Sequence, residues 1–298
     1  MNRFVVLLIV FLITTKSLHS NVRLETGDTN DRSNSRKNYF LCSIGLSRVL
    51  YRDFATSPLF YRGPGFTIGM AWQWQDTKRE QFLGLDLTAA MPHALTPKNN
   101  YFQTGNSALF SNGNFYYHYL RKLRIFPSQK WDLKLGGAAV SAFNVRYNSA
   151  LGNNSLGIES IMNLMLAAKA THNISRTQTK AWKLWFLHRT FQPVERYLSF
   201  QMNVGVFNFN YRPGYAYVYD AEINGSSTSL INYNFADYGW KMNGWKLGAK
   251  LEFSKFSKHG NGRRWAYIWE AANVPGRFEA FQMASHRIQF TVMINRKK

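Results

Sequence analysis

A histidine and a hydroxyl residue two positions apart come nearest to a hydrolytic arrangement in this sequence. In His188-Arg189-Thr190, the two outer residues fall on one face if the segment is a strand. An imidazole next to a hydroxyl can act as the base that activates it as a nucleophile. Threonine is the poorer nucleophile, no His-x-Ser occurs, and no acidic partner is evident. We therefore predict no catalytic residue and interpret both as polar strand residues, with His188 the first residue to test if the protein hydrolyses lipid.

The other chemistry-bearing residues are dispersed. The remaining downstream histidines show no metal-ligand spacing, and the single cysteine, Cys42, excludes an intrachain disulfide framework; these histidines are His93, His118, His172, His259 and His286. Glycine-rich pieces such as 62–66 lack the strand–glycine–helix context of a phosphate cradle. The sequence predicts no metal and no cofactor, and the protein is more simply a non-enzyme.

The chain is strongly basic, with 37 basic and 16 acidic residues and a net charge of +21. Such a charge suits either nucleic acid or an anionic surface or solute. The basic residues are scattered along the chain, whereas a nucleic-acid binder gathers them on one face or helix. We therefore predict no nucleic-acid partner.

Residues 1–20 resemble a secretory signal peptide. Arg3 supplies the positive start, 4–14 form an apolar core, and Ser17 and Ser20 offer cleavage sites. That core is shorter than the roughly 20 residues of a spanning helix, although a retained anchor is the alternative. Residues 21–38 are almost devoid of apolar side chains and are expected to form a mobile polar segment. The chain is therefore expected to be exported.

From residue 39 onward, apolar and polar residues alternate with a period of two. In 66–75, five apolar residues fall on one face, and small or polar residues fall on the other. The same split recurs in 131–139, 198–206, 245–253 and the final segment to 295. Less regular segments are 40–51, 80–90, 114–123, 158–170, 181–191, 215–220 or 229–235, and 264–270. We predict about twelve strands (10–14), with 158–170 alternatively a short helix.

Composition helps to distinguish a transmembrane β-barrel from a soluble β-sandwich, both of which have alternating strands. Aromatic residues are 16% and charged residues only 18% of the chain, against about 25% charged in an average soluble domain. Tryptophans near strand ends suggest the interfacial girdles of a membrane barrel. We predict an all-β fold, a single antiparallel transmembrane β-barrel over 39–298, with these lipid-facing or girdle residues: Phe66, Trp72, Trp74, Trp131 and Trp245. A soluble exported β-sandwich is the alternative.

These features together resemble the outer-membrane β-barrels of Bacteroidota-type bacteria, without pointing to a specific family. The resemblance rests on the signal peptide, the strand pattern and a last strand near the C-terminus. The chain departs from such barrels in its end, since the last aromatic residue is Phe290 and a basic tail follows. It implies a bacterial outer-membrane location, contact with outer-membrane lipid, and other envelope proteins as partners.

The polar faces of the predicted strands carry more basic than acidic residues. If these faces point inward, the residues lining the lumen are Lys134, Lys183, Arg189, Lys246, Lys250, Arg287, Asp86, Asp132 and Glu252. Rings of lysine and arginine favour anions in pores. We therefore expect either a narrow, anion-preferring channel, or a plugged barrel that serves as a subunit or docking platform. A barrel lipid hydrolase and the soluble binding protein remain the alternatives.

Overall fold

The fold is described from a computed structural model that covers 36–57, 59–94, 106–123, 130–212, 241–275 and 279–296. The chain separates into two compact units, Met1–Ser35 and Arg36–Lys298. The predicted signal peptide and nearly all of the predicted polar segment belong to the first unit and lie outside the described residues. All of the described strands belong to the second unit.

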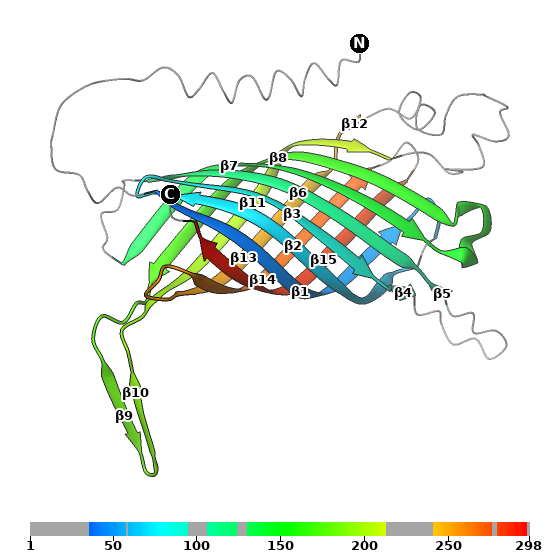
Figure 1. Cartoon of the computed structure of the whole chain (residues 1–298). Helices are drawn as coiled ribbons and strands as arrows, with labels where there is room; N and C mark the ends of the chain where they lie inside the picture. Colours follow the sequence, from blue (N-terminus) through cyan, green and yellow to red (C-terminus); the bar gives the residue numbers. More distant parts are fainter. Residues whose placement is uncertain are drawn as a thin grey trace, which may run out of the picture. The chain divides into compact units, whose positions relative to one another are not determined.

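Ten long antiparallel strands form one closed sheet, the β-barrel shown in Figure 1. Each strand pairs with its neighbours along the chain, and the barrel closes because β1 pairs with both β2 and β15. The strands are β1 (Lys37–Asp53), β2 (Tyr61–Gln75), β3 (Arg79–Ala90), β6 (Leu109–Lys122), β7 (Trp131–Tyr147), β8 (Leu156–Asn173), β11 (Glu195–Tyr211), β13 (Trp245–Phe256), β14 (Gly262–Pro275) and β15 (Ala280–Asn295).

Short elements occupy the connections. The two-residue strands β4 (His93–Ala94), β5 (Asn106–Ser107) and β12 (Lys241–Met242) extend the barrel sheet locally. A short 3-10 helix, η1 (Ser149–Asn154), joins β7 to β8. Between β8 and β11, strands β9 (Lys180–Leu184) and β10 (Leu187–Phe191) pair only with each other. No helix in the described part of the chain is long and apolar enough to cross a membrane.

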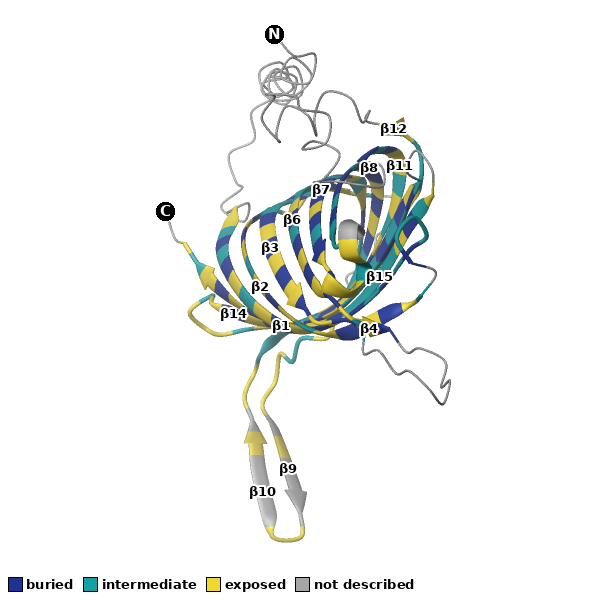
Figure 2. Ribbon diagram, turned by 90° about the vertical axis from the view of Figure 1, so that its right-hand side faces the viewer, coloured by how far each residue is buried: buried dark blue, intermediate teal, exposed yellow. Residues whose placement is uncertain are grey.

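The alternation predicted from the sequence is the alternation between the two sides of the barrel wall. In β2, Phe66, Ile68 and Met70 are exposed on the outside, whereas Thr67 and Gln73 are buried in the lumen. Figure 2 shows the same exposed and buried banding on successive strands. An outer face of large apolar side chains on a closed sheet excludes the soluble two-sheet sandwich, which hides such residues between its sheets.

The barrel has ten strands, so the predicted number of about twelve is too high, although ten lies within the predicted range. Segment 181–191, predicted as one strand, turns back on itself at Trp185 and Phe186 and forms β9 and β10. The other extra segment, 215–220 or 229–235, lies outside the described residues. Segment 158–170, for which a helix was the alternative, belongs to β8, an 18-residue strand.

Small residues make room for long ones inside the barrel. A side chain on Gly69 would overlap Asp86 and Ser43, and one on Gly84 would meet the ring of Tyr116. The end of the lumen where β1 ends and β15 begins also holds stacked aromatic rings, with the centroids of Tyr51 and Tyr61 4.8 Å apart. The interior is therefore filled by side chains, as expected of a barrel of this size.

Candidate functional site: the charged lumen

Charged side chains form three groups along the lumen, and the first lies near the terminal end, where β1 begins and β15 ends. The carboxylate of Glu80, on β3, binds Lys134 of β7 at 2.8 Å and Lys169 of β8 at 2.6 Å. All three side chains are at most 7% exposed. Glu80, Lys134 and Lys169 stand at the inward-facing positions of their strands, so all three side chains point into the lumen. Glu80 thus links three strands from within.

A second carboxylate extends this group to the opposite wall. Glu252 of β13 contacts Lys250 at 3.0 Å, Arg264 of β14 at 3.3 Å and Lys169 at 3.5 Å. Arg264 also donates a hydrogen bond to Gln73 of β2, and Gln73 donates one to Glu80. The contacts form a chain across the lumen, from β3 through β8 and β13 to β14 and β2. We refer to this set as the terminal-end network.

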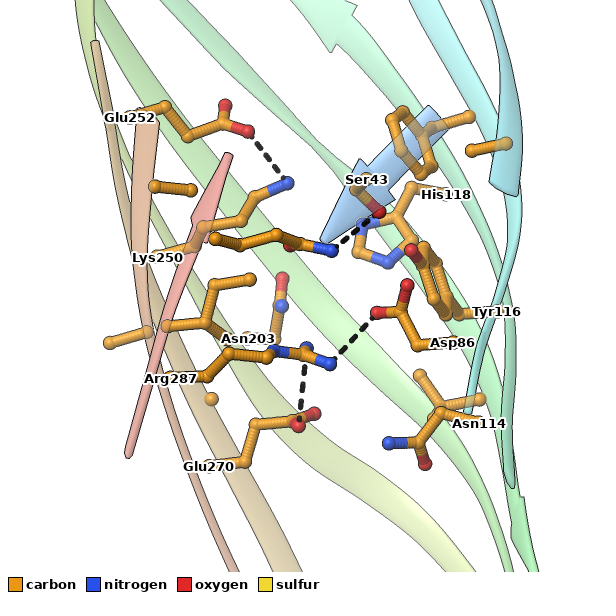
Figure 3. A pocket seen from close by; sticks show the side chains of 18 of the residues that line it. Ser43, Asp86, Asn114, Tyr116, His118, Asn203, Lys250, Glu252, Glu270 and Arg287 are labelled. Atoms are coloured by element: carbon orange, nitrogen blue, oxygen red, sulfur yellow. Dashed lines mark hydrogen bonds and ion pairs between the residues drawn. The ribbon is translucent and has the colours of Figure 1, made fainter. Parts of the chain in front are cut away.

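The centre of the lumen holds a second set of ion pairs, the central network (Figure 3). Arg287 of β15 lies 3.0 Å from Asp86 of β3, on the opposite wall, and 3.9 Å from Glu270 of β14. Glu270 in turn lies 3.8 Å from Lys246 of β13. Asp86, Arg287 and Lys246 are buried. The arginine therefore bridges the lumen at mid-height.

The far end of the lumen is crossed by a third set, the far-end network. Asp53, at the end of β1, binds Arg146 of β7 at 2.7 Å and also pairs with Arg212, which follows β11. Arg146 pairs with Glu159 of β8 as well. These four side chains are nearly inaccessible to solvent. Unlike exposed pairs, buried pairs are costly to break singly because the remaining charge is left uncompensated.

Little free space remains between these networks. A cavity of about 80 Å³ lies at mid-lumen, lined by residues such as Asp86, His118, Lys250 and Arg287. A space of about 20 Å³ lies beyond it, and another of about 10 Å³ lies beside Glu80. By the same measure of free space, one water molecule needs roughly 10–15 Å³. The described lumen thus has room for a few waters rather than for an open path.

The lumen is closer to electrical balance than the sequence suggested. The terminal-end network contains four basic side chains (Lys134, Lys169, Lys250 and Arg264) and two acidic ones, Glu80 and Glu252. The central and far-end networks each contain two of either sign. The excess over these described residues is therefore 8 − 6 = +2, all of it at the terminal end.

The structure brings together six of the nine residues predicted to line the lumen. These six belong to the terminal-end and central networks: Lys134, Lys246, Lys250, Arg287, Asp86 and Glu252. Asp132 lies at the rim, partly exposed, where it pairs with Lys122 at 3.4 Å and Lys134 at 3.3 Å. On the outer wall, the structure places Phe66, Trp72, Trp131 and Trp245 as exposed and Trp74 as half-buried.

Lys183 and Arg189 need correction, because they lie in β9 and β10 and not in the barrel wall. The same hairpin contains His188 and Thr190, whose register partners are Lys183 and Ala181. Neither short strand contains an acidic residue that could orient the histidine. The nearest approach to a hydrolytic site is thus on a hairpin that pairs with no strand of the barrel.

Several charged residues of the lumen were not predicted from the sequence. They are Glu80, Lys169, Arg264, Glu270, Asp53, Arg146, Glu159 and Arg212. Alternation could have identified those in regular strands, since Lys169 has apolar neighbours on both sides. His118 also reaches the lumen, where its Nδ1 lies 2.8 Å from Gln201 Nε2.

No family model and no curated protein matches the chain. Among solved structures, it is similar to the translocator domain of the autotransporter NalP from Neisseria meningitidis, at 9% identity and a TM-score of 0.35, over 94% of this chain and 92% of that one. It is also similar to an outer membrane channel from Pseudomonas putida F1, at 6% identity and a TM-score of 0.29, over 91% of this chain and 100% of that one. A third similar structure is the β domain of the Bordetella autotransporter BrkA, at 8% identity and a TM-score of 0.30, over 86% of this chain and 99% of that one. At these TM-scores the likenesses carry no argument about activity.

Proposed function

We propose that the protein is an outer-membrane β-barrel with a closed lumen, which serves as a membrane-embedded subunit or docking platform. Its span through a bilayer is supported by the outer face of the wall, where large apolar side chains such as Ile44, Ile68 and Leu251 are exposed. The strands are 12 to 18 residues long, and a tilted strand needs about 9–11 residues to cross. An even number of antiparallel strands is the rule for bacterial barrels.

The observation that carries the platform function is the blocked lumen. Three ion-pair networks cross it, and the mid-lumen cavity measures only about 80 Å³. A hydrated ion cannot pass without displacing at least one of the side chains that fill these layers. In this function, the outer surface of the barrel and the segments that connect its strands would bind partners, and the lumen would not serve as a permanent pore.

Conductance in planar bilayers tests this proposal. The purified wild-type protein should insert and show no stable current steps. Shortening one lumen-filling side chain in each network, in Lys250→Ala/Arg287→Ala/Arg146→Ala, should produce steps, because these residues belong to the terminal-end, central and far-end networks, respectively. The matched control is Arg263→Gln, which removes a charge from the exposed side of β14 and should remain silent. Stable steps from the wild-type protein would contradict the closed lumen, and absence of insertion would contradict the membrane span.

The second candidate is a narrow anion channel that opens by rearranging the terminal-end network. It is favoured by one observation, the four basic and two acidic side chains of that network. A ring with excess positive charge attracts anions. In the same bilayers, the wild-type protein would then show steps whose reversal potential in a salt gradient favours the anion. Current that favours cations would exclude this candidate.

A further inference from the structure

Three arginines lie close together on the outer wall, near the far end of the barrel. Arg48 and Arg52 point outward from β1, and Arg62 points outward from β2. Arg48 is paired in register with Pro64, and Arg62 with Leu50, so the two arginines are diagonal neighbours across adjacent strands. We refer to Arg48, Arg52 and Arg62, together with His286 of β15, which lies directly opposite Arg48, as the arginine patch.

The arginine patch has no carboxylate partner within the described ranges. None of its three guanidinium groups takes part in an ion pair or a side-chain hydrogen bond there, whereas the lumen arginines are all paired. The alternating positions that face outward on β1, β2 and β15 contain no acidic residue. On β15, Arg52 pairs in register with Gln282. The acidic residue nearest to this position in the sequence is Glu279, which lies just before β15 begins. Among the described residues, the positive charge of the patch is therefore uncompensated.

Two of the basic groups are held in place by aromatic side chains. The guanidinium of Arg52 lies over the ring of Phe54 at 4.0 Å and over that of Phe60 at 4.9 Å. Its Nε is buried and has no hydrogen-bond partner. His286 Nδ1 lies 2.7 Å from the hydroxyl of Tyr267, on β14. Such contacts reduce the side-chain freedom that a bound anion would otherwise have to remove.

The patch directly continues the apolar outer face. On β1, Arg48 follows the outward residues Ile44 and Leu46, which are 56% and 72% exposed, and on β2, Arg62 precedes Phe66, which is 50% exposed. A lipid whose acyl chains lay against this face would place its headgroup at the height of the arginines. Guanidinium groups recognise phosphate through charge-assisted, often bidentate, hydrogen bonds.

We propose that the arginine patch binds the phosphate headgroup of an acidic membrane lipid whose acyl chains pack on the neighbouring apolar face. This inference rests on the membrane span proposed above. The proposed site lies on the outer wall and not in the lumen, whose charged side chains are turned inward and paired. Because the binding is electrostatic, it should weaken as ionic strength rises.

Native mass spectrometry of the full chain in neutral detergent tests the proposal. The probes are phosphatidylglycerol and phosphatidylcholine with identical acyl chains. The wild-type protein should retain phosphatidylglycerol in preference, and Arg48→Gln/Arg62→Gln should weaken that binding about thirtyfold, from about 1 kcal/mol for each arginine near a charged lipid surface. The matched control, Arg121→Gln/Arg263→Gln, removes two exposed cations of the opposite end and should change the affinity less than about threefold.

Three outcomes would overturn the proposal. They are an unchanged phosphatidylglycerol affinity in Arg48→Gln/Arg62→Gln, an equal loss in the control, and complete displacement of the lipid by millimolar inorganic phosphate, which would make the ligand a free anion. Insertion into phosphatidylcholine vesicles, followed by sedimentation, is measured alongside for every variant. A wild-type protein that fails to insert contradicts the proposed membrane span, whereas normal insertion with unselective lipid binding contradicts only the arginine patch.

Discussion

Glu80 is the residue that joins most of the terminal-end network. Its two carboxylate oxygens serve different lysines, Lys134 and Lys169, and one of them also accepts a hydrogen bond from Gln73. The side chain is only 6% exposed. Alternation in 80–90 was enough to expect a strand here, and the same alternation turns Glu80 inward. Its partners were not predictable, because they come from strands 54 and 89 residues away.

Replacing Glu80 with glutamine should destabilise the barrel by about 3 kcal/mol, because the buried ammonium groups of Lys134 and Lys169 lose their nearest counter-charge and keep only carboxylates at 3.3 and 3.5 Å. Urea-induced unfolding in phosphatidylcholine vesicles, followed by tryptophan fluorescence, measures the change. Glu195→Gln is the matched control. Glu195 pairs with Lys37 at 3.4 Å, with side chains 40% and 52% exposed, so its loss should cost less than about 1 kcal/mol. Equal losses in the two variants would show that the lumen pairs are as well solvated as the exposed one.

Two connections at the terminal end illustrate how much local sequence specifies. The β2–β3 turn is set by Asp76, whose carboxylate accepts hydrogen bonds from the Arg79 side chain and from the backbone N–H groups of Lys78 and Arg79. Burial alone would raise the pKa of Asp76, but these hydrogen bonds hold that pKa below its usual value. The β8–β11 connection lacks such a signal, since Trp185 and Phe186 form its turn without glycine, proline or asparagine. Its aromatic and aliphatic residues therefore led to the wrong prediction of one continuous strand.

Deleting the β9–β10 hairpin, by replacing 180–191 with a short Gly-Ser linker, should leave the barrel intact. In the described part of the chain, β9 and β10 pair only with each other, and β8 pairs directly with β11. The expected result is an unchanged vesicle-unfolding midpoint and unchanged heat-dependent migration in gels. Loss of insertion in the deletion variant would mean that the hairpin is needed for assembly. Trp185→Ser/Phe186→Ser, which keeps the hairpin length and removes two side chains that are 94% and 82% exposed, would then tell whether its aromatic tip is the cause.

At the scale of the whole molecule, the same alternation separates a charged interior from an apolar exterior. The overall charge of +21 is thus compatible with a membrane span, because basic residues such as Lys134 and Arg287 are turned inward and paired, while others lie near the barrel ends. Sequence periodicity was sufficient for the fold class and for the direction of the side chains. It was insufficient for the number of barrel strands, because an apolar segment such as 181–191 can form a separate hairpin and not a strand of the barrel.

A charge placed on the outer wall should cost most at mid-height. Ile68 lies on β2 between Ile44 of β1 and Leu87 of β3, all of them exposed apolar residues. Ile68→Arg should therefore destabilise the inserted barrel by about 2–4 kcal/mol. Gly113→Ser is a control that alters exposed volume without charge on β6, where only Leu87 would touch the added atom. Equilibrium unfolding in vesicles measures both, and a negligible cost for Ile68→Arg would place this face in water.

The pairing of β1 with β15 joins Tyr39 to Asn295, almost the full length of the folded unit apart. This seam cannot form until β15 has been made. A polypeptide interrupted before 280 would keep β1 and β14 as two long unpaired edges, each able to recruit strands from another molecule. Biogenesis must therefore protect the incomplete chain until its final strand arrives, and a premature stop would yield aggregate rather than a smaller working barrel.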